Sequence, residues 1–573
     1  MLKKIIALVL AILMVMAVFV GCGKKKNNLD SETKATTKAH TTLNDDDDEE
    51  DVTPDDEEEE SEETEEETER QTIDWNQTNA DITLDGEVND TAEADEWSVD
   101  YILNPDNWEG ADEKLESIDY EGYDFNVLAD TANSISQYEF LVESDGSIIK
   151  EKVAERKAYV EEYLGINFNI VEFEGGYGNM EGFASEIEAS SGAGTPYDLS
   201  VSYCLIPPIV AAKGLSRDLA ESDNLNLLNT TKPYWGSGIK DEIMIGGRIF
   251  WMSDNSSWTS IRSMTGIFVN VDMFERVNQG LTKQHLYDMV HGKTWTMENL
   301  LILSQNGYAN TNTGEEKIDG IDNGDEFGFA AAVNMARVDL WLYGAGYRYT
   351  KLNNRGTYEW TLADQPLIDF INWWQEMIQN DDDVRCSNPG SDTIVTDGRA
   401  IFMHAPVLTC EDNIEYNFTV LPMPFYKTAV KNNYTTSLCN MYGSYLIPKA
   451  TKTEAFERSA TVLEILAAGG NKYLAPAYFE IYLKRQVAAA DLEMMKMFNI
   501  IRNSIAFDLG YLYGTSLTVE NLNGSGYDEL FLALRRLWTD STGKYNNITT
   551  IWAQVGGTAT TKLNNLMVDI LDY

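Results

Sequence analysis

The chain has few cysteines, few histidines and few basic residues. Five of its 573 residues are Cys and four are His, and no CxxC pair, HExxH or other zinc-ligand spacing occurs. GxSxG, P-loop and GxGxxG motifs are also absent, so no familiar hydrolase or nucleotide-binding signature is present. Lys and Arg number 43 against 94 Asp and Glu, and the net charge of −51 argues against nucleic acid as a partner. We therefore expect no metal, no cofactor and no catalytic role.

The cysteines divide into one near the N-terminus, Cys22, and four in the body of the chain. A large exported fold does not need disulfides, so we interpret the four as buried thiols, with a Cys410–Cys439 bridge left open. The four body cysteines are Cys204, Cys386, Cys410 and Cys439.

Residues 1–22 have the pattern of an export signal. Two lysines precede the apolar run Ile5–Val20, and Phe19-Val20-Gly21-Cys22 closes it. That ending resembles a bacterial lipobox, in which the cysteine becomes the lipidated first residue. An ordinary signal peptide or a spanning anchor stays open, although Ile5–Val20 is shorter than the roughly 20 residues that a spanning helix needs. The lipobox implies anchoring by lipid alone at the outer face of a Gram-positive-type cell membrane.

Residues 23–118 are predicted to form a disordered acidic tether. Asp45 to Glu69 contains 19 acidic residues and no Lys or Arg, so the segment repels itself and cannot bury a core. Removing these 19 charges leaves about −32 (51 − 19) on the remainder. No other apolar stretch is long enough to span a membrane.

The remaining 450 or so residues are too many for one core, and their pattern predicts an α/β protein of two lobes. Strands are expected at 123–129, 166–171 and 197–203, with helices at 148–163 and 180–189 between them. This alternation favours parallel pairing, and ligands of such sheets bind beyond the carboxyl ends of the strands. Asp130 and Tyr203 lie at those ends, so both are candidate ligand-binding residues.

Several later segments resemble extracellular solute-binding proteins, the receptor subunits of ABC importers, in the carbohydrate-type family 1 branch. The order of these segments carries the resemblance, which covers most of the chain from Tyr123 onward. They are Gly247-Arg248-Ile249-Phe250-Trp251-Met252, Ile267–Phe274, Lys293–Leu300, Asp397–Met403, Val420-Leu421-Pro422-Met423-Pro424 and Tyr445-Leu446-Ile447-Pro448.

The resemblance implies a periplasmic-binding-protein-like fold, in which each lobe is a mainly parallel sheet flanked by helices and a hinge joins the lobes. It divides the body into 119–268 (first part of lobe 1), 269–402 (first part of lobe 2), 403–445 (return to lobe 1) and 446–573. The last part is expected to be helical, mainly in lobe 2, with an extension. The expected crossovers are Gly266–Asn270, Phe402–Ala405 and Ser444–Pro448.

Aromatic residues supply the candidate sugar contacts, because C–H faces of sugars pack on rings while hydroxyls need polar partners. The loop Trp251–Trp258 offers two rings and Asp254, with Arg262 nearby, and Trp341 and Tyr343 are expected to face it from the second lobe. The resemblance adds His404 as a candidate ligand-binding residue, because it follows the return strand. Tyr442 is a further candidate, because it lies in a similar place near the last crossover. The turn Asp319–Glu326 is too compressed for an EF-hand, so we favour a polar turn there, with Ca²⁺ left open.

Together these features predict an anchored, monomeric binding protein that captures a mono- or oligosaccharide by hinge closure and delivers it to the permease of an ABC importer. Two alternatives remain. One is a sensor or adhesin that uses the same cleft without transport. The other is a glycoside hydrolase with two carboxylates, for which Asp254 with Glu411 or Asp412 could be imagined, although no motif fixes such a pair.

Overall fold

A computed structural model describes residues 115, 117–141, 148–225, 232, 234–235, 242–309, 325–332, 338–380, 384–387, 394–411, 414–427, 434–478, 492–514, 517–520, 527–529 and 548–572. The chain divides into two units, Met1–Thr68 and Glu69–Tyr573, and every described residue belongs to the second. The predicted signal with Cys22, nearly all of the tether and the turn up to Gly324 lie outside the described residues. Within the described part, no helix combines the length and apolarity that crossing a membrane requires.

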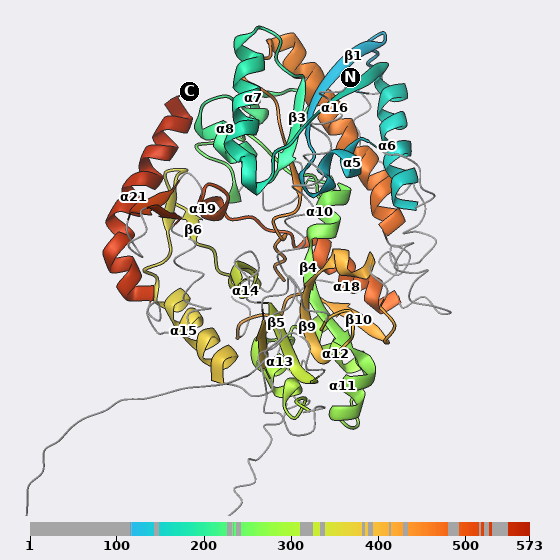
Figure 1. Cartoon of the computed structure of the whole chain (residues 1–573), viewed down its shortest axis with the longest axis vertical. Helices are drawn as coiled ribbons and strands as arrows, with labels where there is room; N and C mark the ends of the chain where they lie inside the picture. The colour runs from blue at the N-terminus through green and yellow to red at the C-terminus, as the bar shows by residue number, and fades with distance from the viewer. Residues whose placement is uncertain are drawn as a thin grey trace, which may run out of the picture. The chain divides into compact units, whose positions relative to one another are not determined.

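The first sheet contains four strands in the order β11-β3-β1-β2. Strand β1 pairs in parallel with β2 and β3, and β11 runs antiparallel to β3. Figure 1 shows this sheet with helices on both sides; the sheet and its helices are called the first lobe below. The strands are β1 Tyr123–Asp130, β2 Ile166–Phe173, β3 Leu199–Tyr203 and β11 Gly443–Leu446. The helices are α5 Ile135–Glu139, α6 Ile148–Leu164, α7 Met180–Gly192, α8 Ile206–Ala212 and α16 Thr453–Gly469.

The local sequence explains this lobe. Strand β3 is buried along its whole length, as a strand covered on both faces must be. Helix α6 buries Val153, Val160 and Leu164 and ends before Gly165, which has φ +61°. A Cβ at Gly165 would lie 2.0 Å from the Asp119 carboxylate, so the turn into β2 requires glycine. The three strands and two helices predicted here are confirmed, with the parallel pairing of β1, β2 and β3.

The second sheet contains five strands in the order β10-β4-β9-β5-β8. Strand β5 pairs in parallel with β8 and β9, whereas β4 runs antiparallel to β9 and β10, so only half of these pairings are parallel. The strands are β4 Thr265–Asn270, β5 Phe327–Ala332, β8 Val384–Ser387, β9 Ala400–Pro406 and β10 Phe418–Leu421. The helices of this second lobe are α11 Val271–Val277, α12 Lys283–His291, α13 Met297–Ser304, α14 Val338–Gly344, α15 Gln365–Asn380 and α18 Leu492–Asn503. The predicted α/β class with two helix-flanked sheets is confirmed.

Short segments connect the lobes. Helix α10 (Trp258–Ser263) leads into β4, and the chain returns to the first sheet between Leu421 and Gly443. Helix α16 packs on α6 of the first lobe, and α18 packs on β10 of the second. Two hairpins complete the strands, β6 Thr350–Leu352 with β7 Tyr358–Trp360 and β12 Thr518–Glu520 with β13 Tyr527–Glu529. Short helical segments lie at Ala132–Ser134, Tyr177–Asn179, Leu219–Glu221, Val407–Glu411 and Gly470–Leu474.

The C-terminal segment contacts both lobes. Helix α21 (Ile548–Asp572) packs against α8 of the first lobe and against β7 and α15 of the second. Figure 1 shows α21 at the left, beside α8 and β6. The short helix α19 (Leu509–Leu512) precedes it.

The cysteine prediction can be checked at three positions. Cys204, Cys410 and Cys439 are buried thiols, as predicted, so the Cys410–Cys439 bridge is not formed.

Candidate functional site

Asp130 forms hydrogen bonds with the backbone at the carboxyl ends of the three parallel strands of the first lobe. Its carboxylate accepts backbone N–H bonds from Ala132 (2.8 Å), Gly175 and Gly176 (both 2.9 Å) and Tyr203 (3.0 Å). A Cβ at Gly175 would lie 2.5 Å from the carboxylate, so only glycine permits this approach. Asp130 is fully buried. It therefore sets the position of the Gly176-Tyr177 loop and of Tyr203 rather than presenting its own oxygens.

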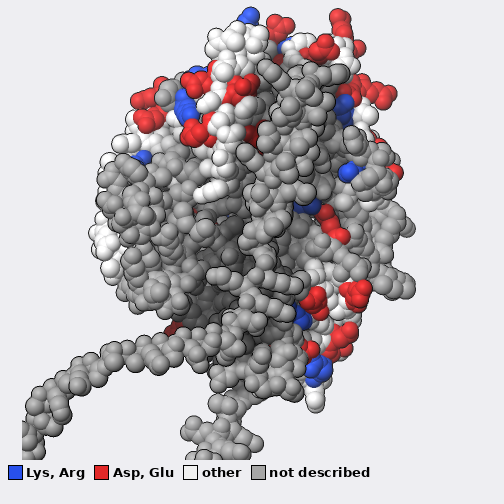
Figure 2. Space-filling model, viewed as in Figure 1, with Lys and Arg blue, Asp and Glu red and all other residues white. Residues whose placement is uncertain are grey.

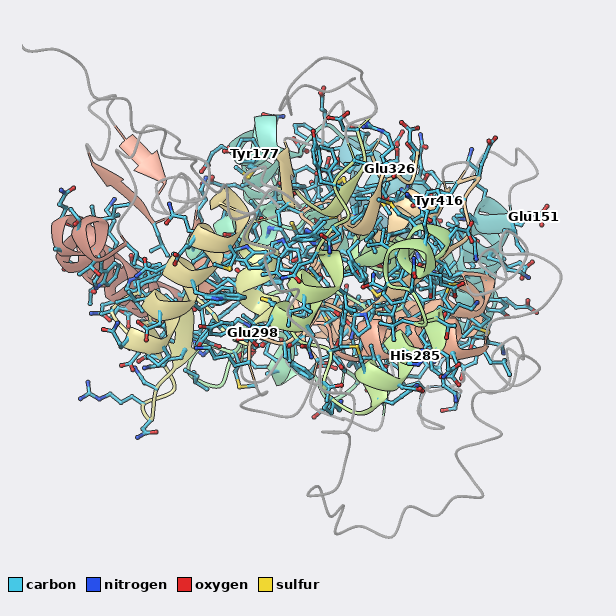
Figure 3. The ribbon with its side chains drawn as sticks, turned by 90° about the horizontal axis from the view of Figure 1, so that it is seen from below. Glu151, Tyr177, His285, Glu298, Glu326 and Tyr416 are labelled. Atoms are coloured by element: carbon cyan, nitrogen blue, oxygen red, sulfur yellow. The ribbon has the colours of Figure 1, made fainter. Side chains whose placement is uncertain are left out.

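Two tyrosines stand at this edge of the first lobe. Tyr177 follows β2 and is 57% exposed, and Figure 3 shows it at the surface of the molecule. Tyr203 ends β3, and its hydroxyl accepts a 2.6 Å bond from the Asn440 amide. Burial, then the nearby groups Cys204, Tyr511 and Tyr177, raise the pKa of Tyr203, so its phenol stays protonated. It can both donate and accept a hydrogen bond.

Three further tyrosines approach from other segments. Tyr442 comes directly before β11, Tyr343 lies in α14 after β5 of the second lobe, and Tyr511 lies in α19. Burial raises the pKa of Tyr343 and Tyr442 well above the ordinary value, and the Tyr511 phenol contributes to both shifts. Tyr511 is thus close enough to interact with phenols from both lobes. We call these five residues, Tyr177, Tyr203, Tyr343, Tyr442 and Tyr511, the tyrosine cluster.

A small hollow of about 20 Å³ adjoins this cluster, with three of its members, Tyr343, Tyr442 and Tyr511, in the wall. The Tyr343 hydroxyl and the Ser437 Oγ are buried there, and neither has a hydrogen-bond partner among the described residues. An unsatisfied buried hydroxyl costs about 1–3 kcal/mol. Two unsatisfied hydroxyls at one hollow indicate a binding site in which a ligand or a water molecule supplies the missing hydrogen bonds.

Two carboxylates border the hollow. Asp508 accepts bonds from the backbone N–H groups of Tyr349 and Tyr511 and from the Thr350 hydroxyl. Burial raises its pKa to about 6, although these bonds oppose the shift. Asp339, also buried, accepts a bond from the Tyr349 hydroxyl. The hollow thus offers acceptors beside phenol donors.

Phe507 and Asp508 also line a larger cavity, of about 730 Å³, on the other side of the same segment. Its walls come from the first-lobe side through Glu242 and from the second lobe through the β6–β7 hairpin and the start of α15. Arg348 bonds Glu242 (Nη2 to Oε1, 2.9 Å) and the Phe507 carbonyl (3.0 Å). We call this space the outer cavity. Its volume lies within the range of about 300–1,000 Å³ that small-molecule sites occupy.

The predicted tryptophan loop lies elsewhere. Trp251 and Trp258 are 1% and 0% exposed and line neither the hollow nor the outer cavity as described. Trp251 donates to the Tyr513 hydroxyl (3.3 Å), and Trp258 packs edge-on against Tyr478. Both rings are placed as core residues.

Asp254 belongs to a buried charge network. Its Oδ1 accepts the Ser256 N–H at 2.6 Å. Burial raises its pKa to about 8, opposed by that bond and by Arg156 and Arg502. The network links Arg156 of α6 to Arg502 of α18, and none of its charged members lines the hollow or the outer cavity as described.

The remaining predicted residues fill positions around β9. Arg262 forms a bidentate ion pair with Glu411, in which Nε donates to Oε1 (2.6 Å) and Nη2 donates to Oε2 (3.0 Å). Its guanidinium also lies over the Tyr138 ring, 4.1 Å from the ring centroid. Trp341 stacks on Trp374 at 4.5 Å and meets the His404 ring edge-on at 5.0 Å. These rings are buried.

Of the ten predicted residues, the structure brings Tyr203, Tyr343 and Tyr442 together, with Asp130 holding the backbone beneath Tyr203. Sequence reasoning missed Tyr177, Tyr511, Asp339 and Asp508. Tyr177 follows a predicted strand at its carboxyl end, so the rule that selected Tyr203 could have found it. Asp508 and Tyr511 come from a segment far along the chain whose approach to the cleft leaves no local signal. Among the described residues, no group of His, Cys, Asp and Glu is arranged to hold a metal ion.

No protein-family model and no curated protein matches the sequence. Solved structures do resemble the chain. An ABC substrate-binding protein from Listeria monocytogenes, solved with cycloalternan, has 10% identity and a TM-score of 0.44, and covers 76% of this chain and 99% of its own. The galacto-N-biose/lacto-N-biose I-binding protein of the Bifidobacterium longum ABC transporter has 12% identity and a TM-score of 0.46 (78% and 99% covered). The GacH receptor of Streptomyces glaucescens, solved with acarbose, has 11% and 0.44 (77% and 99%). At these identities and scores the likeness assigns neither a role nor a ligand to this chain.

Proposed function

We propose that this protein binds a carbohydrate in the cleft between its two lobes, at the tyrosine cluster. One observation carries the proposal. The hydroxyl of Tyr343 is buried without a described partner in a hollow to which both lobes contribute phenols. The mixture of rings, protonated phenols and carboxylates suits a neutral ligand with C–H faces and many hydroxyls.

Each group then has a chemical role. The tyrosine rings pack against the apolar faces of a sugar, and Tyr343 and Ser437 hydrogen-bond its hydroxyls. Asp508 and Asp339 accept hydrogen bonds from sugar hydroxyls. Asp130 acts through the backbone, because it holds the loops that carry Tyr177 and Tyr203.

Ligand entry requires the lobes to separate. A hollow of about 20 Å³ holds about one water molecule, not a sugar ring. A hinge motion that opens the cleft would admit the ligand, and contacts with both lobes at once would then favour closure. The outer cavity is the open space nearest to the hollow, and we place the entry route there.

The finer proposals concern location and partners. A protein lipidated at Cys22 and held off the membrane by its acidic tether would work at the outer cell surface and pass its ligand to an ABC importer. Replacement of Cys22 by Ser should abolish metabolic labelling with a fatty acid and release the protein from membranes. Persistent labelling of the variant would refute the lipobox assignment.

The alternatives make different demands. A sensor or adhesin would use the same cleft, and reconstituted uptake with the permease separates it from an importer subunit. A glycoside hydrolase needs two available carboxylates. Of the imagined pair, Asp254 is buried in its network, Glu411 bonds Arg262, and Asp412 lies outside the described residues. Turnover of a bound sugar would revive that function.

The decisive experiment is calorimetric titration of the full chain with mono- and oligosaccharides, repeated for Tyr343→Phe. Removal of a buried hydroxyl that has no described protein partner should leave the melting temperature equal to or above that of the wild type and weaken sugar binding at least fivefold. Tyr416→Phe is the matched control, because its hydroxyl bonds the Val395 carbonyl within the second lobe (2.7 Å), and Figure 3 shows it far from Tyr177. The control should lower stability and leave affinity intact. Equal affinities of wild type and Tyr343→Phe, or no binding of any sugar, would overturn the proposal.

A further inference from the structure

A third cavity, of about 830 Å³, lies at the opposite edge of the first sheet from the tyrosine cluster. It is lined by Tyr123 at the start of β1 and by Asp198 directly before β3, whereas Asp130 and Tyr203 stand at the far ends of these strands. The seven steps from Tyr123 to Asp130, at about 3.3 Å each, separate the two edges by roughly 23 Å along β1. This space, which we call the outer-edge cavity, is therefore separate from the cleft.

Two helix ends meet at the outer-edge cavity. The C-terminal end of α7 contributes Ala189, Ser190 and Ser191, followed by Ala193 and the loop after it, and the N-terminal end of α16 contributes Lys452 and Ala455. Figure 1 shows these two ends side by side at the top of the first lobe. Lys452 is the N-cap of the 17-residue helix α16 and supplies no side-chain bond to its first N–H groups. That wall of the cavity is accordingly rich in hydrogen-bond donors.

Two hydroxyls in the lining lack partners. Thr451 is 3% exposed, and its Oγ1 has no hydrogen-bond partner among the described residues, although its backbone N–H bonds the Pro448 carbonyl. The Oγ of Ser191, at the end of α7, is buried without a described partner as well. Buried hydroxyls normally have a partner, so both point to a molecule absent from the chain itself.

The facing wall presents rings and acceptors. The Tyr197 hydroxyl donates to Glu186 (2.9 Å), and the Tyr123 hydroxyl donates to Asp198 (3.1 Å). Since both phenols use their protons on carboxylates, their oxygens remain able to accept bonds. The Arg458 guanidinium stacks on the Tyr123 ring at 3.7 Å and stands 3.8 Å from Asp198, which stiffens that wall.

The charges select the kind of ligand. Glu186 and Asp198 oppose an anion, and acidic side chains predominate over the upper part of the surface in Figure 2, where the first lobe lies. Lys452 and the α16 N-terminus oppose a cation. A neutral molecule whose groups both donate and accept matches donors on one wall and acceptors on the other.

We propose that the outer-edge cavity is a second binding site, independent of the cleft, which takes an uncharged, hydroxyl-rich carbohydrate. Its position on the outside of the first lobe leaves room for a long chain, because nothing limits the ligand to what the cleft can enclose. Such a site would hold the protein on a polysaccharide while the cleft remains available. The proposal does not depend on what the cleft binds.

The test is native electrophoresis of the full chain in gels containing soluble starch, xylan, β-glucan or galactomannan. At least one polysaccharide should retard the wild type, and Tyr343→Phe should be retarded equally, because the cleft is not involved. The double variant Thr451→Val with Glu186→Gln should reduce the apparent affinity at least tenfold. Thr453→Val, an exposed position in the same helix turn, is the matched control and should migrate as the wild type does.

Thermal denaturation of the same variants guards against a folding artefact. Thr451→Val replaces an unsatisfied hydroxyl by a methyl group, so its melting temperature should equal or exceed that of the wild type. No retardation by any of the four polysaccharides would overturn the proposal. Retardation that Tyr343→Phe abolishes, or that the double variant leaves unchanged, would overturn it too and would assign the polysaccharide contact to the cleft or another surface.

Discussion

Replacement of Asp254 by Asn should flatten the pH dependence of stability. Asp254 is 1% exposed, and desolvation raises its pKa to about 8 despite the Ser256 N–H bond and the nearby guanidinium groups of Arg156 and Arg502. The buried carboxylate of Glu139 on α5 adds to the upward shift. Folding therefore makes Asp254 take up a proton over the whole range between its unfolded and folded pKa values.

The sign and size follow from linkage. A pKa raised by folding gives stability that is fully present below about pH 4 and is lost as the pH rises to about 8. Within that window the free energy of unfolding falls by about 1.4 kcal/mol per pH unit from this group. Between pH 5 and 8 the loss amounts to about 4 kcal/mol. Asn cannot ionise and keeps an oxygen for the Ser256 N–H, so its contribution is constant.

Urea denaturation of the full chain, followed by tryptophan fluorescence at pH 5, 6, 7 and 8, measures the effect. The variant should be less stable than, or equal to, the wild type at pH 5 and should gain on it by about 4 kcal/mol by pH 8. Asp364→Asn is the control, because that carboxylate is 44% exposed and pairs with Lys351 at the surface. Its stability difference from the wild type should stay nearly constant.

A stability difference between Asp254→Asn and wild type that does not vary from pH 5 to 8 would refute the reasoning. It would mean that the two arginines keep Asp254 ionised in the folded protein.

Two further predictions concern residues that the sequence singled out. Trp258→Ala should lower the free energy of unfolding by about 3–5 kcal/mol, because the ring is fully buried; loss of sugar affinity at unchanged melting temperature would instead return this loop to the binding site. Arg262→Gln should weaken sugar binding by up to about fivefold, since Arg262 joins Tyr138 of the first lobe to Glu411 after β9 and the pair is only partly buried. Calorimetric titration measures the second effect, and unchanged or tighter binding would contradict it.

The fold could be predicted where local pattern and packing agree. Strands β1, β2 and β3 alternate with α6 and α7 along the chain, and Gly165 marks the end of α6 in the sequence itself. The second sheet was harder, because β4, β9 and β10 mix antiparallel with parallel pairings and their fully buried sequences do not reveal direction. Their order followed from the resemblance rather than from periodicity.

The candidate site was predicted only in part, for a physical reason. Tyr203 stands at a strand end, which topology identifies, whereas Tyr511 approaches the same cluster from more than 300 residues away along the chain. The Trp251–Trp258 loop shows the opposite case, in which residues predicted for a cleft are buried in the core. Two tryptophans among polar residues indicate a stacking surface equally well as a core, and burial of 1% and 0% could be known only from the packing around them.

The C-terminal helix limits how the proposed cleft can open. Two hydrogen bonds join the Gly246–Arg248 turn to neighbouring segments. The backbone N–H of Gly246 donates to the Gly356 carbonyl (2.9 Å), and the Arg248 guanidinium donates to the Leu571 carbonyl at the end of α21 (3.2 Å). The Glu242–Arg348 ion pair is a third polar contact of this kind. Each of the three contacts stabilises the closed arrangement by about 1 kcal/mol or less when it is partly exposed. Breaking these polar contacts therefore costs only a few kcal/mol, but a full opening must also separate the apolar packing of α21 on α8 or on β7 and α15. A ligand that contacts both lobes adds its differential affinity for the closed state to this balance.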